Sequence, residues 1–357
     1  MRIGVNALYM LPGRVGGTEI YLRSLLAAMA RVAPEHEYRV FINFETEAAP
    51  FDAAPCVTMV PVGVWATSRV ARILAEQGSL ARAVHREGCD VLFNPGFTAP
   101  RWLKCPSVTV FHDLQHRRHP EFFRWWDLPF WNLLLGQSAR GAARLIAVSE
   151  ATRRDLMHYY SVDATVVHHG VDERLFELGR GPEVDGEKML LCVSTLHPHK
   201  NLVRLVRVFA RFRERHPEWR LVIAGMRGHH AKAVEAAAGE GVTITGWISR
   251  EKVYGLYAQA RAFVYPSLFE GFGMPVVEAL AAGLPVACSD IPVLHEVGGE
   301  GGSVVYFNPL NDEAMLSALE GLVGRSGDRQ AAWGFSWERC ARETVEVLAA
   351  AVAARRR

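Results

Sequence analysis

Short apolar runs alternate with helical patterns along the whole chain, and this alternation constrains the possible folds more than any other feature. Each run has the length and the Val, Ile and Leu content of a buried strand. Strands that alternate with helices form parallel sheets through right-handed crossovers. The sequence therefore predicts an α/β protein. The expected strands lie within 1–9, 38–44, 57–62, 90–96, 107–113, 144–149, 164–170, 188–194, 219–225, 242–247, 261–267, 284–289 and 302–308.

Length and one polar stretch predict the domain organisation. The 357 residues are more than one hydrophobic core usually serves. Residues 177–188, ELGRGPEVDGEK, are rich in glycine and acid, as linkers are. We expect a first domain at 1–178, a second at 187–335, and a final helix at 336–357 that packs back on the first. Parallel sheets bind ligands at the carboxyl ends of their strands, so a cleft between two of them would suit an enzyme with two substrates.

Composition argues against several classes of protein. Forty Lys and Arg oppose thirty-eight Asp and Glu, so the charge gives no reason to expect a nucleic-acid partner. The six cysteines form no CxxC pair, which argues against a zinc site and for a reducing compartment. No apolar run reaches the roughly 18 residues of a spanning helix, and the first ten residues lack the apolar core of a signal peptide. We expect a cytoplasmic protein, with peripheral contact at the inner face of the membrane left open.

The segment 266–290 carries the strongest chemical signal, two carboxylates on either side of a glycine turn and a helix start. Glu270 follows an expected strand, and Glu278 would lie one turn into the next helix. Gly271 and Gly273 permit close ligand approach, and Pro275 suits the first turn of a helix. The free N–H groups of a helix start attract a phosphate, and the two carboxylates could accept hydrogen bonds from sugar and ribose hydroxyls. This order of groups predicts a nucleotide-sugar site.

The same segment resembles the E-x7-E signature of family 4, the retaining glycosyltransferases with the GT-B fold. The resemblance runs through 246–299, covers essentially all of the second domain, and extends more loosely over the first. It implies two Rossmann-like domains with parallel sheets that face each other across a cleft. It also implies that Glu270 contacts the donor sugar, that Glu278 contacts the ribose, and that the backbone at Phe272 and Gly273 holds the distal phosphate.

The loop 196–201, LHPHKN, opens a long helix of the second domain. Lys200 near a helix start is electrostatically unfavourable unless an anion is bound there. Thr195, Lys200 and Asn201 match a variant of the family loop found in its mannosyltransferase-like group, whereas His199 stands where many members have Arg. We expect all four residues at the donor diphosphate; the alternative for Lys200 is a solvated lysine.

Two motifs of the first domain complete the set of expected site residues. His112 ends the strand in 107–113 and resembles the family histidine that faces the donor sugar; the alternative is a structural histidine. Gly16 and Gly17 lie in 13–19, GRVGGTE, whose spacing is not GxGxxG. The resemblance implies that this loop approaches the phosphates and the acceptor, and a bare turn is the alternative.

The aromatic segment 121–135, EFFRWWDLPFWNLLL, carries apolar residues most of the way round a helix. Such a helix is usually buried. A wall of the acceptor site, or an interfacial anchor for a lipid-linked acceptor, is the alternative.

Together these residues predict a retaining, metal-independent hexosyltransferase without a cofactor. The donor would be a nucleoside-diphosphate sugar, GDP-mannose being favoured by Thr195, and the acceptor a hydroxyl of a glycan or glycolipid precursor. His112 and Glu270 would bracket the sugar, while Lys200 and the helix start at Gly273 neutralise the leaving diphosphate. Three alternatives are a nucleotide-sugar epimerase of the same architecture, a dinucleotide oxidoreductase, which the absence of GxGxxG disfavours, and a non-catalytic sugar-nucleotide sensor.

Overall fold

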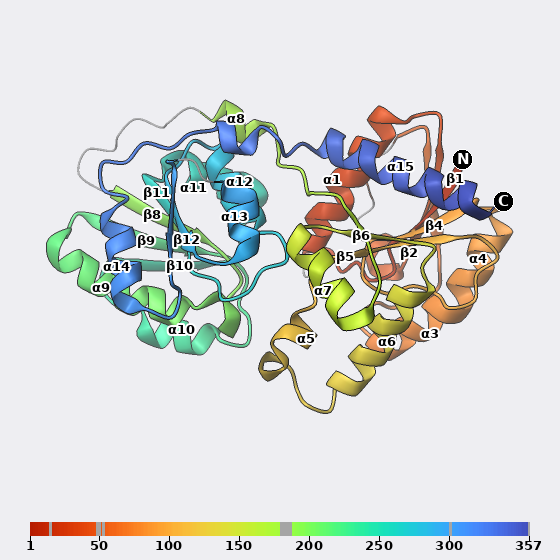
Figure 1. The fold of residues 1–357 in the computed structure, drawn as a ribbon, viewed down its shortest axis with the longest axis horizontal. Coiled ribbons are helices and arrows are strands. Elements are labelled where there is room, and N and C mark those ends of the chain that lie inside the picture. The colour runs from red at the N-terminus through yellow and green to blue at the C-terminus, as the bar shows by residue number, and fades with distance from the viewer. Residues whose placement is uncertain (14–15, 48–50, 52–53, 179–187, 300–301, 356–357) are drawn as a thin grey trace. The chain divides into compact units, whose positions relative to one another are not determined.

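The computed structural model describes residues 1–13, 16–47, 51, 54–178, 188–299 and 302–355. The chain divides into two compact units (Figure 1): unit 1 holds residues 1–170 and 336–357, and unit 2 holds residues 171–335. The boundary therefore lies before the expected position at 178. The reason is that Val171 donates its N–H to Phe335 O (3.1 Å), and Asp172 accepts a hydrogen bond from Tyr254 (2.7 Å). Most of the linker expected at 177–188 falls on 179–187, outside the described residues.

Unit 1 is built on a seven-stranded parallel sheet with the order β3-β2-β1-β4-β5-β6-β7. Its central strands read as continuous apolar runs because both faces are covered; all five residues of β5 are buried. The strands are β1 (Arg2–Asn6), β2 (Glu37–Ile42), β3 (Val57–Pro61), β4 (Val91–Asn94), β5 (Ser107–Phe111), β6 (Arg144–Ala147) and β7 (Thr165–Val166).

Helices cover this sheet, and the C-terminal helix is one of them. α15 packs along α1 and contacts β4, β5 and β6 (Figure 1). The helical elements of unit 1 are α1 (Gly17–Val32), α2 (Phe44–Glu47), α3 (Arg69–Ala75), the π-helical turn η1 (Glu76–Leu80), α4 (Ala81–Arg86), α5 (Gln115–Arg118), the 3₁₀ turn η2 (Pro120–Phe122), α6 (Leu128–Gly141), α7 (Glu150–Tyr160) and α15 (Trp337–Arg355).

Unit 2 repeats the plan with a six-stranded parallel sheet of order β10-β9-β8-β11-β12-β13. α9 and α14 pack together over its core, which includes Phe209, Ile223 and Met315. The strands are β8 (Lys188–Val193), β9 (Trp219–Ala224), β10 (Val242–Gly246), β11 (Ala262–Tyr265), β12 (Val286–Ser289) and β13 (Val304–Phe307). The helices are α8 (Arg174–Glu177), η3 (Pro198–Lys200), α9 (Leu202–Arg215), α10 (Ala231–Ala237), α11 (Arg250–Gln259), α12 (Met274–Ala281), α13 (Pro292–Gly298), α14 (Asp312–Glu320) and η4 (Gln330–Ala332).

The predicted fold class is confirmed, because each of the thirteen expected runs contains a strand of one of the two parallel sheets. The expectation of one helix over 121–135 is wrong. Helix α6 begins only at Leu128, since Pro129 lacks an N–H and therefore fits the first helical turn. The expected burial of this segment is also wrong at Trp125, Trp126 and Phe130, which are exposed. Among the described residues, no helix is long and apolar enough to cross a membrane.

Candidate functional site

The turn between β11 and α12 lies at the carboxyl edge of the unit 2 sheet. Gly273, the residue before α12, has a φ of 94°, and a Cβ there would lie 2.7 Å from Leu294 Cδ2. Both the left-handed backbone and this close approach require glycine. The Phe272 side chain is buried against the Phe335 ring at 5.7 Å between centroids. The helix start is therefore held in one position, with its first-turn N–H groups at the end of the strand.

Lys200 and Glu270 form a nearly buried ion pair next to this turn. Lys200 Nζ lies 2.5 Å from Glu270 Oε1, and the two side chains are 12% and 11% exposed. Lys200 Nζ also donates to the Tyr265 hydroxyl at 3.2 Å. Two residues that the sequence separates by seventy positions are thus brought together, and each was expected at the donor site.

The electrostatics of this pair keep Glu270 ionised. Burial works to raise the pKa of Glu270, but the charge and hydrogen bond of Lys200 outweigh it, so the net shift of the pKa is downward. Burial, followed by the charge of Glu270, raises the pKa of Tyr265 well above its usual value. Tyr265 therefore stays a neutral hydroxyl beside a charged pair.

The loop that carries Lys200 is tied to the β11–α12 turn through its backbone. His199 O accepts a hydrogen bond from Leu268 N at 2.7 Å, and the His199 ring stacks on His197 at 5.8 Å between centroids. Asn201 has a φ of 57° and precedes α9, and its Nδ2 donates to Pro309 O at 2.8 Å. The Asn201 amide therefore anchors a neighbouring loop, a partner that its expected donor role did not anticipate.

Glu278, expected at the ribose, is buried and already engaged by the protein. Its Oε1 lies 2.7 Å from Arg250 Nη2, and its Oε2 accepts from the Tyr257 hydroxyl at 2.9 Å. Arg250 Nε donates to the Tyr254 hydroxyl at 2.8 Å, and that hydroxyl donates to Asp172 Oδ2 at 2.7 Å. The sequence interpretation missed this network, although an arginine at the start of a helix was a visible signal.

His112 lies at the end of β5 in unit 1 and is buried as a neutral imidazole. Burial lowers the pKa of His112 to about 4, with the Pro95 contact opposing the shift. Its Nε2 lies 2.7 Å from Pro95 O; a carbonyl only accepts, so Nε2 carries the proton and Nδ1 is left as an acceptor. The ring packs edge-on against Tyr21 (4.8 Å) and Phe97 (5.2 Å).

The loop after β4 that supports His112 was not foreseen as part of a site. Phe97 has a φ of 68°, an uncommon conformation for a large side chain and one that clusters at functional sites. Deeper in unit 1, the buried Glu76 accepts hydrogen bonds from Asn6 (2.6 Å) and Thr98 (2.9 Å), and burial raises its pKa. The sequence signal for this region was the turn NPGF after a strand.

The two glycines at the start of α1, Gly16 before the helix and Gly17 as its first residue, have different roles in the fold. Gly16 has a φ of 60°, so its backbone favours glycine, whereas a Cβ on Gly17 would meet no heavy atom within 4 Å. Packing therefore does not require glycine at position 17. Tyr21, one turn further along α1, contacts His112 and so brings this helix start near the histidine. Thr195, in unit 2, is half-buried just after β8.

A cavity of about 320 Å³ opens beside these elements of unit 1. Its lining combines aromatic rings with a few polar groups, as sugar-sized pockets do. The lining includes Tyr9, Arg72, Phe97, Asp113, His116 and Trp131. Asp113 also accepts the Gln115 N–H at 2.9 Å, which fixes the start of α5 beside the cavity.

Comparison with known proteins agrees with this architecture. A model described as Glycosyltransferase Family 4 matches residues 15–175, and one described as Glycosyl transferases group 1 matches 176–333. The chain is 29% identical to O-antigen chain mannosyltransferase B of Escherichia coli, over 73% of this chain and 74% of that protein. It is 30% identical to the MMP alpha-(1->4)-mannosyltransferase of Mycolicibacterium hassiacum, over 80% of this chain and 74% of that protein.

Among solved structures, sucrose-phosphate synthase from Thermosynechococcus elongatus is similar with a TM-score of 0.72 at 17% identity, over 99% of this chain and 96% of that one. At this identity the likeness shows the fold alone. The sequence matches show more, because the two family models cover consecutive parts of the chain and a relative is 30% identical. The chain belongs to the family 4 glycosyltransferases, with the GT-B fold and a resemblance to its mannosyltransferases.

Proposed function

We propose that this glycosyltransferase moves a hexose, in the first place mannose from GDP-mannose, to a hydroxyl of a glycan or glycolipid precursor. The mannosyltransferase names of both relatives and the Thr195 variant of the donor loop support mannose. The observation that carries the proposal is the Lys200–Glu270 pair at 2.5 Å beside the start of α12.

This arrangement suits a donor that carries a diphosphate and a sugar. An ammonium group has three N–H donors, and the contacts of Lys200 with Glu270 and Tyr265 use two of them. The third would bind a phosphate oxygen, together with the backbone at Phe272 and Gly273. Glu270 would accept hydrogen bonds from the sugar hydroxyls, because its lowered pKa keeps it an acceptor. Thr195 and His199 would line the same diphosphate.

Glu278 keeps its proposed ribose role in a modified form. Each carboxylate oxygen accepts more than one hydrogen bond, so the contacts with Arg250 and Tyr257 leave acceptor capacity on both oxygens. Arg250 would then orient Glu278 for the ribose and not bind the nucleotide itself.

The proposed reaction proceeds with retention and without a metal ion. The acceptor hydroxyl bonds to the anomeric carbon on the face from which the diphosphate leaves, the carbon–oxygen bond to the diphosphate breaks, and the hydroxyl proton passes to the leaving phosphate. Lys200 and the helix start would stabilise the charge that develops on that phosphate. Nδ1 of His112 would accept a hydrogen bond from a sugar hydroxyl. The unit 1 cavity and Gly17 would bind the acceptor.

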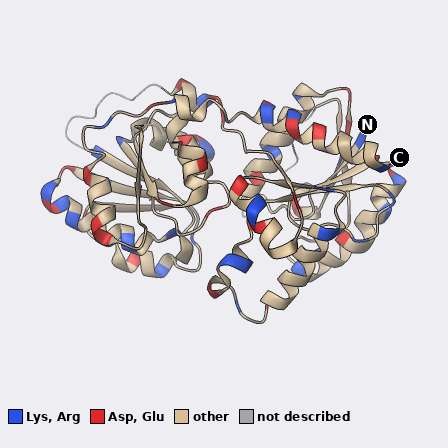
Figure 2. Ribbon diagram, in the orientation of Figure 1, with Lys and Arg blue, Asp and Glu red and all other residues tan. Residues whose placement is uncertain are grey.

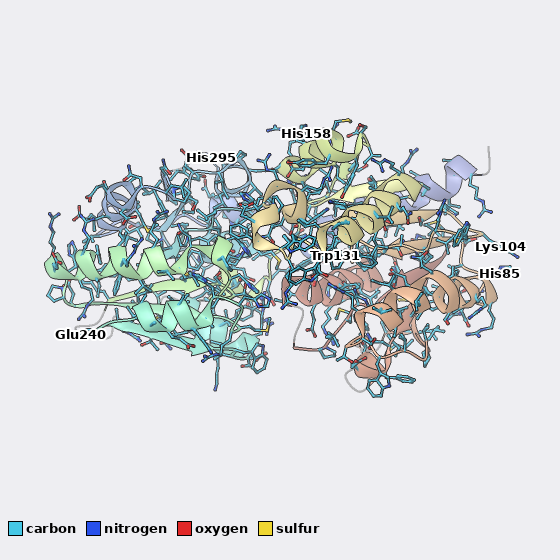
Figure 3. All side chains as sticks on the ribbon, turned by 90° about the horizontal axis from the view of Figure 1, so that it is seen from below. His85, Lys104, Trp131, His158, Glu240 and His295 are labelled. Carbon is cyan, nitrogen blue, oxygen red and sulfur yellow. The ribbon has the colours of Figure 1, made fainter. Side chains whose placement is uncertain are left out.

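The test compares Glu270→Gln with the control Glu240→Gln. Glu240 is a glutamate of unit 2 whose side chain is 90% exposed and which Figure 3 labels at the left end of the view. Release of GDP from GDP-mannose and binding of GDP are measured for each. Glu270→Gln should lose hydrolysis and keep GDP binding, while Glu240→Gln should keep both. Full hydrolysis by Glu270→Gln would contradict the proposal.

Donor identity is tested separately by thermal shift with a panel of nucleotide sugars, since a ligand that binds the folded state raises the melting temperature. GDP-mannose should give the largest shift. A larger shift with UDP-glucose would refute the mannose donor and leave the transferase assignment standing. Proton NMR of the product should show the retained anomer, and EDTA should leave the rate unchanged.

A further inference from the structure

Glu278 is held differently from the carboxylates on the surface of unit 2. Figure 2 shows charged residues of both signs spread over this unit. Many of their ion pairs lie in solvent, such as Arg211 with Glu313, and pairs of that kind contribute little to stability. The Glu278 side chain is only 4% exposed, so its charge depends on the protein groups around it. Those groups form a chain of contacts that reaches back to the start of unit 2.

Arg250 and Tyr254, one turn apart on α11, form the middle of this chain. Arg250 Nη2 donates to Glu278 Oε1 at 2.7 Å, and Arg250 Nε donates to the Tyr254 hydroxyl at 2.8 Å. The two nitrogens belong to one planar guanidinium, so the two contacts together fix its orientation. If the Tyr254 contact were lost, the guanidinium could turn about its remaining contact with Glu278.

The Tyr254 side chain is fixed at its ring and at its hydroxyl. The side chain is buried, and the guanidinium carbons of Arg174 and Arg250 lie 4.9 Å and 5.0 Å from the centre of its ring. The hydroxyl donates to Asp172 Oδ2 at 2.7 Å. Burial raises the pKa of Tyr254, so the hydroxyl keeps the proton that it donates.

Asp172 ends the chain in the first residues of unit 2. Its neighbour Val171 donates to Phe335 O, so the first and last residues of the unit meet beside it. Arg174 Nη2 also lies 2.8 Å from Asp172 Oδ2. Burial works to raise the pKa of Asp172, but the hydrogen bonds from Arg174 and Tyr254 outweigh it and lower the pKa to about 2. Asp172 is therefore an ionised acceptor at neutral pH.

We propose that Asp172 and Tyr254 are positioning residues for the ribose of the donor nucleotide. Tyr254, held by Asp172, fixes the guanidinium of Arg250, and Arg250 keeps Glu278 in one orientation for the ribose hydroxyls. This inference rests on the proposed ribose role of Glu278 and extends it to two residues outside the E-x7-E segment. An acceptor that is already oriented loses less conformational freedom when the ligand binds. The two residues should therefore raise the affinity for the nucleotide without touching it.

The experiment measures binding to the full chain by isothermal titration calorimetry. The ligands are GDP and dideoxy-GDP, which lacks both ribose hydroxyls, and UDP and dideoxy-UDP are titrated in parallel so that the result does not depend on the base. The test variant is Tyr254→Phe, which keeps the ring and removes only the hydroxyl. The matched control is Tyr38→Phe, which removes a buried hydroxyl of unit 1 that donates to Ala33 O at 3.0 Å.

The wild type and Tyr38→Phe should bind the nucleotide more tightly than its dideoxy form. Tyr254→Phe should bind the nucleotide about three- to tenfold more weakly, the range expected for one hydrogen bond, and should bind the dideoxy form as the wild type does. Asp172→Asn keeps an oxygen that accepts from Tyr254, so it should lose less affinity than Asp172→Ala. This second pair of variants serves if Tyr254→Phe fails to fold.

A purely structural role of the chain predicts the same loss with the nucleotide and with its dideoxy form. That result, or unchanged nucleotide binding by Tyr254→Phe and Asp172→Ala, would overturn the proposal and leave the ribose role of Glu278 standing. A wild type that binds neither nucleotide, or that binds each as tightly as its dideoxy form, would refute the ribose role itself and this inference with it.

Discussion

Replacing Lys200 by methionine isolates the contribution of the buried ion pair. Methionine keeps much of the side-chain length and removes the charge, so Glu270 loses the cation 2.5 Å away and the remaining carboxylate is only 11% exposed. Removal of one partner of a buried pair costs about 3–5 kcal/mol, because the other charge is left unpaired. Since Glu270 can take up a proton, we expect a loss near the lower end, about 3 kcal/mol of unfolding free energy at neutral pH.

The loss should depend on pH in a direction that the structure specifies. In the wild type the pKa of Glu270 in the folded state is lowered. The contribution of Glu270 to the free energy of unfolding is therefore fully present above its pKa in the unfolded chain, and it is lost as the pH falls through its pKa in the folded protein. In Lys200→Met the lysine charge no longer offsets the effect of burial, so burial raises the pKa of Glu270 in the folded state. The folded variant then binds a proton more readily than the unfolded chain, and the penalty shrinks as the pH falls towards the unfolded value.

Urea denaturation at about pH 7.5 and about pH 5 measures both effects. The double variant Lys200→Met/Glu270→Gln carries neither charge and should be more stable than the sum of the single losses predicts, by about 2 kcal/mol. Lys188→Met is the control, since Lys188 and Glu218 form an exposed pair at 3.3 Å whose removal should change little. Additive single losses, or a pH-independent loss, would refute the reasoning.

Three further predictions concern the loops. Gly17→Ala should leave the melting temperature unchanged, because the added Cβ meets no heavy atom within 4 Å, but it should lower the rate of transfer if the loop contacts a ligand. Gly16→Ala, at a φ of 60°, should instead destabilise unit 1 by about 1 kcal/mol. His112 has a folded pKa of about 4, below its unfolded value, so stability should fall by about 3 kcal/mol in total as the pH drops from about 6.5 to about 4, and His112→Gln should flatten that profile in thermal melts. If His199 touches the diphosphate, the donor KM should fall as the pH drops through its titration, and both His199→Ala and His199→Arg should abolish the slope; parallel profiles for all three proteins would exclude the contact.

The sequence alone was sufficient for the two sheets and for part of the turn that we propose binds the donor. Strand length, apolar runs and helical periodicity are local properties, so the thirteen expected runs matched strands of the structure. Gly273 was also readable, because a glycine before a proline-containing helix start has a local backbone reason, which its φ of 94° bears out. The place of Glu270 after β11 followed from the same local pattern.

Tertiary structure decided what surrounds each of these groups. Glu278 pairs with Arg250 and Tyr257, twenty-eight and twenty-one positions away in the chain, and no spacing rule connects residues on separate helices. His112 is neutral because burial among neighbouring rings lowers its pKa, although the contact with Pro95 O opposes that shift. The segment 121–135 shows the reason most clearly. Its apolar residues go most of the way round a helix, and only the packing of unit 1 determines that one stripe is buried while Trp126 and Phe130 are left in solvent.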